Sequence, residues 1–290
     1  GGLGNQMFQY GAGKTLAQYY GVPLMLDTSA FEKYSGASPS RTFRLNNLNI
    51  SASIASSEVL RKLTNSHLPA KIRLFIRMYD RRKPYFRRSI YLEPHFHYDT
   101  NFFNAPRQVL LNGYWQSWRY IKDIEAVLRR EFVVRSPMRD QNRQLAEAIN
   151  STDSVGVHIR RGDYVEDKKS NQFHGVLPKV YYQRCVEYMC TQVDEQPHFF
   201  VFSDDPAWAR ENLRIDSPTI FVKHNGPDKD YEDLRLISLC KHQIIANSSF
   251  SWWGAWLNIN PNKLVMAPKK WFNKSENITK DLFPKSWHII

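Results

Sequence analysis

A cluster of charged residues follows a short apolar run in the second half of the chain. The run 155–159 ends in Arg160 and Arg161, and Gly162 and Asp163 come next. Short β-branched runs of this kind are typical of buried strands in a parallel sheet. Ligands bind just beyond the carboxyl ends of such strands, and paired guanidinium groups suit phosphate oxygens. The pattern therefore predicts a phosphate or diphosphate site, with the Asp163 carboxylate beside it.

A surface ion pair between arginine and aspartate would explain an isolated pair after a strand. Here His158, both arginines and Asp163 occur together within six positions of one strand end, from 158 to 163. Because so many ionisable and hydrogen-bonding groups share one predicted strand end, a ligand site is the better interpretation. We assign Arg160, Arg161 and Asp163 as catalytic candidates. Asp163 is our candidate for the general base, with orientation of Arg161 as its other possible role.

Two more polar turns follow predicted strands. Asp204 and Asp205 come after the strand 198–202, and the segment 247–251 comes after the strand 243–246. The carboxyl ends of parallel strands meet at one edge of a sheet, so the three turns should line the same edge. The segment 247–251 opens a helix, whose free backbone N–H groups bind anions. Arginines and a helix start together predict a diphosphate pocket.

The two adjacent aspartates have alternative roles. Asp204 or Asp205 could accept hydrogen bonds from a ribose or a guanine edge, or could cap the helix expected over 206–213. A pair of carboxylates also suggests Mg²⁺, but Pro206 follows and no further carboxylate lies nearby in the sequence. We therefore predict no metal site. A nucleotide diphosphate held by arginines and backbone amides without a metal fits a metal-independent sugar transferase, in which the protein itself neutralises the departing diphosphate.

The elements that would position these turns alternate regularly after residue 150. Strands are expected over 155–159, 198–202, 219–222, 243–246 and 263–267, with helices after Pro178 and over 206–213, 230–241 and the segment that contains Trp252, Trp253 and Trp256. Strand–helix alternation of this kind indicates a doubly wound α/β domain. We treat the three tryptophans as core residues.

The first half is less regular. A glycine-rich turn at 1–6 leads into a helix over 7–20, a strand over 22–26, helices near 54–65 and 70–80, a loop at 93–98, a strand at 109–111 and helices over 118–131 and 139–149. The segment 11–15 (GAGKT) suggests a P-loop, but the first glycine of that motif would fall at Phe8. We reject the P-loop. We place the domain boundary at residue 150, which gives domains 1–150 and 151–290.

The charge favours an anionic partner. Forty Lys and Arg residues against 28 Asp and Glu residues give a net charge of +12, which suits a nucleotide, a nucleic acid or an anionic membrane surface. Eight basic residues lie between Lys71 and Arg88, with Asp80 as the single acidic residue and with apolar residues interleaved. This segment is either a solvated helix face or a basic amphipathic helix that rests on a membrane or guides an anionic acceptor.

Hydropathy and cysteine content bear on the compartment. The mean hydropathy is −0.53, no apolar run reaches the length of a bilayer span, and no signal segment is visible. Cys185, Cys190 and Cys240 lack metal-ligand spacing, so we interpret them as small core residues of a reducing compartment. We expect a cytoplasmic protein with peripheral contact to the inner membrane as an option.

Four motifs resemble one known family. They are GGLGNQMFQY (1–10), HIRRGDY (158–164), FSDD (202–205) and ANSSFSWWGAWL (246–257). In this order they resemble the α-1,2-fucosyltransferase family, glycosyltransferase family 11, over nearly the whole chain. The resemblance implies an α/β fold of GT-B type, with two Rossmann-like domains facing a central cleft. The domain 1–150 would lie on the acceptor side and the domain 151–290 would bind the donor.

The resemblance also implies a reaction. The donor would be GDP-β-L-fucose, and L-fucose would be transferred with inversion to the 2-hydroxyl of a terminal galactoside on an oligosaccharide or glycolipid, with no metal or other cofactor. Arg160 would bind the β-phosphate. The other donor-binding residues would be Ser248, Ser249 and Phe250 along the diphosphate, His158, Asp204 and Asp205 near the nucleoside, and Gly4, Asn5 and Gln6 from the first domain.

Other functions remain open on the residues alone. One is a transferase that uses a GDP-sugar to make a different linkage, and another is an NTP-dependent enzyme. A third is a lectin-like relative without activity, which the intact Arg160 and Asp163 disfavour. A basic nucleic-acid-binding protein is the fourth. In the second half, however, the basic residues follow strands rather than form one stripe, so we expect no nucleic acid. The expected role is a bacterial enzyme of surface-polysaccharide or O-antigen biosynthesis.

Overall fold

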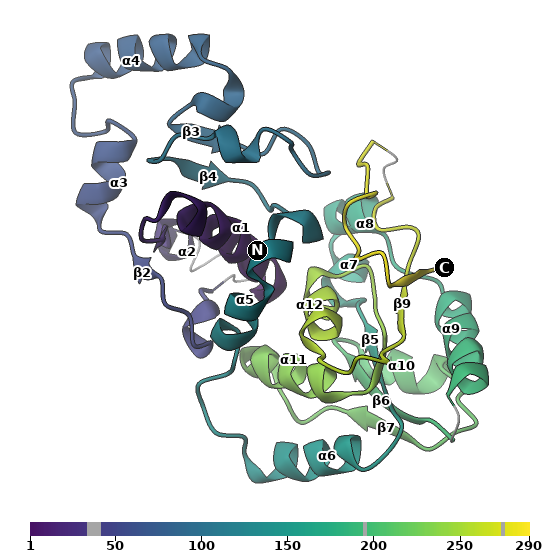
Figure 1. Cartoon of the computed structure of the whole chain (residues 1–290). Helices are drawn as coiled ribbons and strands as arrows, with labels where there is room; N and C mark the ends of the chain where they lie inside the picture. Colours follow the sequence, from purple (N-terminus) through teal and green to yellow (C-terminus); the bar gives the residue numbers. More distant parts are fainter. Residues whose placement is uncertain (34–41, 194–195, 274–275) are drawn as a thin grey trace. The chain divides into compact units, whose positions relative to one another are not determined.

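The computed structural model describes residues 1–33, 42–193, 196–273 and 276–290. The chain divides into two units (Figure 1), and each is described by itself. The first unit comprises Gly1, Asn5–Phe132 and Ile278–Phe283, and the second comprises Gly2–Gly4, Val133–Asn277 and Pro284–Ile290. The division falls before helix α6 (Asp140–Asn150), earlier than the expected boundary at residue 150.

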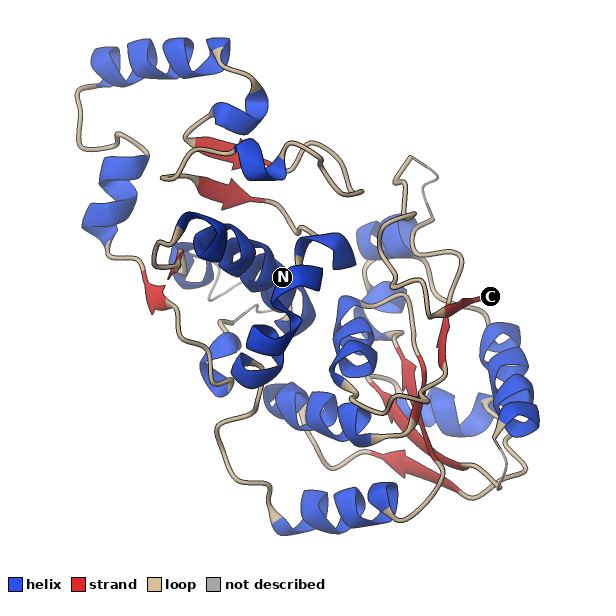
Figure 2. Ribbon diagram, in the orientation of Figure 1, coloured by secondary structure: helices blue, strands red, loops and turns tan. Residues whose placement is uncertain are grey.

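The second unit is built on a six-stranded parallel sheet with the order β10-β9-β8-β5-β6-β7 (Figure 2). The strands are β5 (Ser154–Ile159), β6 (His198–Ser203), β7 (Thr219–Val222), β8 (His242–Ile244), β9 (Val265–Ala267) and β10 (His288–Ile289). The chain adds β6 and β7 outward on one side of β5 and then returns to place β8, β9 and β10 on the other side. This doubly wound order confirms the predicted α/β class.

Helices cover both faces of this sheet. They are α6, α9 (Lys179–Gln192), α10 (Pro206–Asn212), α11 (Asp230–Leu239) and α12 (Ser249–Leu257). Val155, Val157 and Ile159 of β5 share one core cluster with residues of α9 and α10, whereas Phe200 and Phe202 of β6 share another with residues of α6 and α11. All six residues of β5 are buried, which explains its continuous apolar run.

Two helices between β5 and α9 were not predicted from the sequence. They are α7 (Gly162–Glu166) and α8 (Lys168–His174). The Asp167 carboxylate caps α8 by accepting hydrogen bonds from the backbone N–H groups of Lys169, at 3.2 Å, and Ser170, at 3.0 Å. No residue of α8 is buried. Apolar periodicity therefore gives no signal for this helix, and local capping supports it instead.

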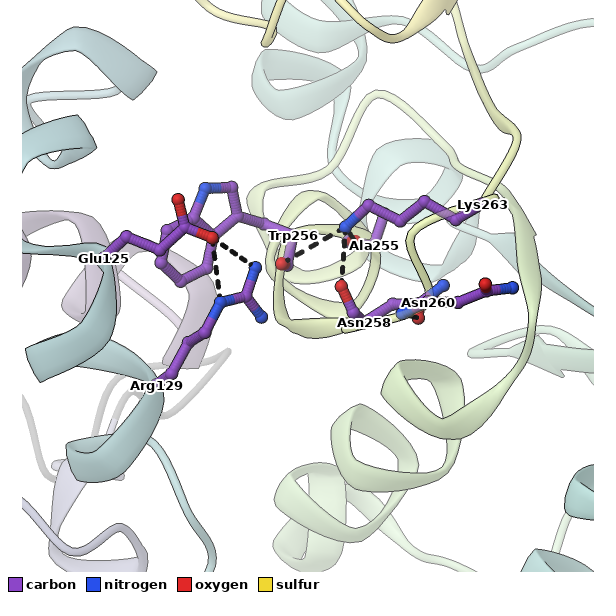
Figure 3. A network of polar contacts seen from close by, with 7 residues as sticks. All are labelled: Glu125, Arg129, Ala255, Trp256, Asn258, Asn260 and Lys263. Atoms are coloured by element: carbon purple, nitrogen blue, oxygen red, sulfur yellow. Dashed lines mark hydrogen bonds and ion pairs between the residues drawn. The ribbon is translucent and has the colours of Figure 1, made fainter.

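Both ends of α12 are capped. At its start, Ser248 Oγ accepts a hydrogen bond from the backbone N–H of Phe250 at 3.3 Å. At its end, Lys263 Nζ donates to the carbonyl oxygens of Ala255 at 2.8 Å and Asn258 at 2.7 Å (Figure 3). A cation beside the last carbonyls satisfies their lone pairs and complements the helix dipole. Trp252, Trp253 and Trp256 are buried, as predicted.

In its described residues, the first unit contains two separate pairs of parallel strands. β1 (Met25–Leu26) pairs with β2 (Ser53–Ile54), and β3 (Ile90–Leu92) pairs with β4 (Leu110–Asn112). The helices are α1 (Leu3–Tyr20, whose first two residues belong to the second unit), α2 (Ser29–Lys33), α3 (Ser57–Leu63), α4 (Ala70–Arg82) and α5 (Glu125–Glu131). No helix of the described chain is long and apolar enough to cross a bilayer.

Three expectations for the first unit were wrong in their bounds. The strand expected over 22–26 is limited to β1. The glycine-rich segment was expected to be a turn, but α1 begins at Leu3, so Gly4, Asn5 and Gln6 form its first turn. Of the helix expected over 118–131, only α5 is an α-helix, and two 3₁₀ turns occupy the preceding residues. Within α5, Arg129 pairs with Glu125 one turn earlier at 2.7 Å (Figure 3).

Lys14 of the rejected P-loop motif lies inside α1 and has a structural partner. Its Nζ forms an ion pair with Glu131 Oε1 at 2.8 Å, and Tyr10 Oη donates to the other oxygen of the same carboxylate at 2.5 Å. Together with burial, this carboxylate raises the pKa of Tyr10 to about 12. Lys14 therefore links α1 to the end of α5 rather than opening a phosphate loop.

Candidate functional site

The three polar turns of the second unit lie along one edge of its sheet. β8, β5 and β6 are neighbours in the order β8-β5-β6, so their carboxyl ends stand side by side. Arg160 and Arg161 follow β5, Asp204 and Asp205 follow β6, and Ser248 follows β8. The winding of the chain reverses between β5 and β8, and open α/β sheets bind ligands at such a switch point. The structure thus brings these residues together as the sequence predicted.

Arg160 stands at this edge with one face against protein. Its Nη1 lies 3.0 Å from Asp204 Oδ2, and its guanidinium carbon lies 5.5 Å from the centre of the Tyr164 ring. The side chain keeps 26% of its surface exposed. A guanidinium that is oriented by a carboxylate and an aromatic ring is ready to bind an anion with little loss of rotamer freedom.

Arg161 is more firmly engaged. Its backbone N–H donates to Asp204 Oδ1 at 2.8 Å, its Nε lies 3.3 Å from Asp205 Oδ2, and its guanidinium stacks 4.0 Å above the Trp208 ring. These contacts tie the turn after β5 to the turn after β6. The arrangement gives Arg161 a positioning role, and its catalytic assignment stays a prediction.

Both aspartates have protein partners. Asp204 binds the guanidinium of Arg160 and the backbone N–H of Arg161. Asp205 binds Arg161 Nε and also caps α10 by accepting a hydrogen bond from the backbone N–H of Trp208 at 3.1 Å. Asp204 also explains Gly162, since a Cβ atom there would lie 2.8 Å from Asp204 Oδ2. Gly162 begins α7 and leaves room for the carboxylate.

His158 is neutral and carries an unused polar atom. The side chain is 7% exposed, its ring centre lies 5.2 Å from that of Phe250, and its Nδ1 has no hydrogen-bond partner in the described chain. Burial, and then the charge of Arg160, lowers the pKa of His158 to about 3. A neutral imidazole beside the sheet edge can exchange one hydrogen bond with a ligand without adding charge. Its contact with a nucleoside stays a prediction.

Gly4 packs against the first turn of α12. A Cβ atom at Gly4 would lie 2.4 Å from the backbone nitrogen of Phe250 and 2.5 Å from the carbonyl carbon of Ser249. Trp253 Nε1 donates to the Gly4 carbonyl oxygen at 3.0 Å. Only glycine fits so close an approach of two backbones. The contact holds the helix start that we predicted to face the diphosphate.

Gln6 is used within the protein. Its Nε2 donates to the carbonyl oxygens of Gly1 at 3.0 Å and Thr42 at 2.9 Å, and its Oε1 accepts the backbone N–H of Arg44 at 2.8 Å. The side chain is buried. These three hydrogen bonds use both N–H donors and one acceptor site of the side-chain amide, so the structure shows a structural role for Gln6. Its contact with the donor stays a prediction.

The general base that we assigned, Asp163, lies in α7, but its side chain is outside the described residues. Its role stays a prediction. In the part of the chain that the structure describes, no group of three or more His, Cys, Asp or Glu side chains could hold a metal ion. The metal-independent reaction likewise stays a prediction.

A second carboxyl group, which the sequence analysis missed, stands at the β3–β4 edge of the first unit. Glu93 follows β3, and its two oxygens accept the backbone N–H groups of Tyr114, at 2.7 Å, and Trp115, at 2.9 Å. Burial outweighs these hydrogen bonds and raises the pKa of Glu93 to about 7. Trp115 is buried with φ at +56°, a left-handed conformation that non-glycine residues rarely adopt. Such strain often occurs at functional sites.

Two side chains suited to a sugar follow β4, in the segment whose backbone N–H groups bind Glu93. Tyr114 is exposed, and Gln116 Oε1 is buried without a hydrogen-bond partner in the described chain. Gln116 Nε2 donates to Oδ1 of Asn5, a predicted donor contact, at 2.8 Å. Exposed aromatic rings and free amide oxygens are common in carbohydrate sites. The signal in the sequence was a glutamate directly after a strand, but the strand is short and Glu93 was assigned to a loop.

A second carboxyl group with a raised pKa lies beyond β7. Asp233, in the first turn of α11, accepts a hydrogen bond from Asn225 Nδ2 at 2.8 Å. Burial, and then the charges of Asp230 and Glu232, raises the pKa of Asp233 to about 7. Carboxyl groups with raised pKa values gather at functional sites, so Asp233 is a further candidate at the carboxyl edge of the second sheet. Sequence patterns do not reveal burial of one carboxyl within an acidic helix start.

Comparisons with known sequences show the family of the chain. The sequence profile of glycosyl transferase family 11 matches residues 56–290. The O-antigen biosynthesis glycosyltransferase WbnK of Escherichia coli is 33% identical, over 97% of this chain and 96% of the relative. An alpha-1,2-colitosyltransferase of Escherichia coli is 32% identical, over 99% of this chain and 95% of the relative. The galactoside alpha-(1,2)-fucosyltransferase 1 of Rattus norvegicus is 29% identical, over 51% of this chain and 41% of the relative.

Among solved structures, the fucosyltransferase NodZ of Bradyrhizobium aligns with a TM-score of 0.49 at 13% identity, over 87% of this chain and 89% of that one.

Proposed function

The chain belongs to glycosyl transferase family 11 and is a glycosyltransferase, and from this premise we propose that it is a galactoside α-1,2-fucosyltransferase. It transfers L-fucose from GDP-β-L-fucose, with inversion, to the 2-hydroxyl of a terminal galactoside. Relatives that bear the name galactoside alpha-(1,2)-fucosyltransferase support this linkage. The relative of O-antigen biosynthesis supports a bacterial polysaccharide precursor as the acceptor.

The observation that carries the proposal is the switch-point edge of the second unit. There Arg160, oriented by Asp204, stands at the end of β5, and the start of α12 stands at the end of the neighbouring strand β8. The fucosyl C1–O bond breaks and GDP departs with the electron pair. Arg160 and the backbone N–H groups at the start of α12 stabilise the charge that develops on the diphosphate.

The acceptor oxygen forms the new bond to C1, and its proton goes to a base. Two carboxyl groups are candidates. Asp163 follows the arginines in the sequence, and Glu93 stands at the edge of the first unit with a pKa of about 7. A base with a pKa near the working pH is partly ionised and still strong enough to accept a proton. The raised pKa makes Glu93 an alternative to Asp163.

A second donor deserves a direct test because of the alpha-1,2-colitosyltransferase relative. Colitose is L-fucose without the 3-hydroxyl. A site that binds this hydroxyl would reject colitose strongly, whereas an apolar site would discriminate weakly. Comparison of kcat/KM for GDP-fucose and GDP-colitose, with the same β-galactoside acceptor, decides between the two donors. Faster turnover of GDP-colitose would replace fucose in the proposal.

The first experiment is calorimetric titration with GDP, UDP and ATP. We expect preference for GDP in the wild-type protein and about 100-fold weaker GDP binding in Arg160→Ala, because a desolvated guanidinium–phosphate contact is lost. Arg210→Ala is the matched control, since that arginine lies on the last turn of α10 over the Phe221 ring. Equal affinity for the three nucleotides, or unchanged GDP binding in Arg160→Ala, would contradict the proposed donor site.

A further inference from the structure

Helix α4 of the first unit exposes an unusual amount of apolar surface. None of its 13 residues is buried, and Figure 1 shows it at the periphery of the unit, joined by a loop at each end. Five large apolar side chains have exposed fractions between 49% and 73%: Ile72, Leu74, Phe75, Met78 and Tyr79. Exposed apolar clusters of this kind mark interaction surfaces on soluble domains.

The spacing of these side chains places them on one broad face. Leu74 and Met78 are four residues apart, as are Phe75 and Tyr79, and side chains at this spacing are neighbours on a helix surface. Asp80 is half-buried and lies on the other side, where its carboxylate binds Lys83 at 3.0 Å and Ser89 Oγ at 3.0 Å. These contacts hold α4 on the unit with its apolar face outward.

The charges around this face are cationic. Lys71, Arg77, Arg81 and Arg82 are exposed, and Asp80, the single acidic residue of the helix, lies on the inward side. Arg77 and Arg81 border the apolar face, whereas Lys71 and Arg82 lie on it near the two ends of the helix. Such a face complements an anionic lipid surface, into which apolar side chains insert while cations meet headgroup phosphates. We propose that α4 is a membrane-docking helix that lies in the headgroup region of an anionic bilayer.

Other occupants fit this surface less well. A second copy of the chain would pair the face with itself around a two-fold axis and bring identical sets of cations together. A nucleic acid or a polar glycan would satisfy the cations but would leave the five apolar side chains in water. At 13 residues the helix is also too short to span a bilayer, so it can lie only along the surface. The inference does not rest on the proposed enzymatic activity.

Vesicle flotation tests the apolar face. We expect the full-length protein to float with vesicles of phosphatidylcholine and phosphatidylglycerol and to remain unbound with phosphatidylcholine alone. The double variant Phe75→Ser with Met78→Ser should bind at least about tenfold more weakly, because two inserted side chains are lost. The control is Ile259→Ser, which removes an 82% exposed apolar side chain from the second unit and should bind as wild type.

A second pair of variants tests the charges. Arg77→Gln with Arg81→Gln should reduce binding by about tenfold or more and flatten its salt dependence, since each cation near an anionic surface adds to the affinity. Lys269→Gln with Lys270→Gln removes two exposed charges from the second unit and should leave binding unchanged. Far-ultraviolet circular dichroism and GDP titration verify that each variant is folded.

Three results would overturn the proposal. One is failure of the folded wild-type protein to float with anionic vesicles at low salt. Another is equal binding by wild type and the α4 variants. The third is self-association in the absence of vesicles that Phe75→Ser with Met78→Ser abolishes, which would assign the face to a second copy. If that variant does not fold, Ile72→Ser with Leu74→Ser tests the same face.

Discussion

In each unit a carboxyl group lies just beyond the carboxyl ends of two neighbouring parallel strands, but the two carboxyl groups have different partners. Beyond the carboxyl ends of β5 and β6, Asp204 binds the guanidinium of Arg160 at 3.0 Å. Beyond the carboxyl ends of β3 and β4, Glu93 binds backbone N–H groups at 2.7 and 2.9 Å. A guanidinium brings a full charge to its carboxylate, whereas two backbone dipoles do not outweigh the burial of Glu93.

The comparison shows that a polar group at the end of a strand can have different chemical properties in the two units. At the β5–β6 edge the carboxylate orients a cation, and the cation helps to keep His158 neutral, so the edge suits an anionic leaving group. At the β3–β4 edge the carboxyl has a pKa of about 7, so it can take a proton from a neutral hydroxyl near physiological pH. Glu93→Gln and Arg160→Lys test this division. Gly4→Ala and Asp233→Asn test the packing and the ionisation that support the edge of the second unit; the expected effects are given from the largest to the smallest.

Glu93→Gln should have the largest effect. We expect kcat to fall by about 100-fold or more, the usual contribution of a positioned base, with GDP affinity unchanged. In the wild type, the rate should fall as the pH drops below about 7, because Glu93 then becomes protonated. This acidic limb should disappear in the variant. Asp163→Asn is the comparison: if it abolishes turnover while Glu93→Gln is active, the base is Asp163 and the contrast between the edges fails.

Arg160→Lys should weaken GDP binding by about tenfold, less than Arg160→Ala, because an ammonium keeps the charge but lacks the planar fork that binds two oxygens. Calorimetric titration measures the difference. If lysine binds GDP as tightly as arginine, the β5–β6 edge supplies only charge. If it binds as weakly as alanine, the geometry of the guanidinium contributes nearly everything.

Gly4→Ala should destabilise the second unit by about 1–3 kcal/mol, since its Cβ would meet the backbone of Phe250 at 2.4 Å and the helix start would have to shift. Thermal unfolding measures the loss. Gly226→Ala is the matched control, because a Cβ there meets nothing within 4 Å. Equal unfolding temperatures for the two variants would show that the start of α12 adapts freely.

Asp233→Asn should have the smallest effect and a defined sign. The pKa of Asp233 is raised to about 7, so ionisation costs stability as the pH rises from about 4 to about 7. The amide keeps the acceptor for Asn225 and avoids this cost. We expect the variant to be more stable than wild type by about 1–2 kcal/mol at pH 8 and equal near pH 4. Denaturant unfolding at both pH values tests this, with the exposed Asp216→Asn as control. If the stability difference between the variant and the wild type is the same at both pH values, the pKa of Asp233 is not raised.

Much of the second unit followed from its sequence. The strands 155–159 and 219–222 were predicted within one residue, because continuous apolar runs between polar turns are local signals. The strand β10 was missed, since two residues near the end of a chain carry no pattern of their own. It forms only by pairing with β9. In the first unit the strands have two or three residues each. Such short strands contain too few residues for a hydrophobic pattern, so their bounds and the loops between them could not be predicted from the sequence.

The sequence by itself determined which chemical groups stand at the end of β5 and at the start of α12, because each is covalently next to an element with a strong local signal. Only the tertiary structure decided what those groups contact. Asp204 packs against Gly162, and the backbone N–H of Trp115 binds Glu93, although each pair is far apart in the chain. The burial of Asp233 likewise depends on residues that pack around it. Burial and charge at a site are sums over neighbours in space, and local sequence patterns contain no record of them.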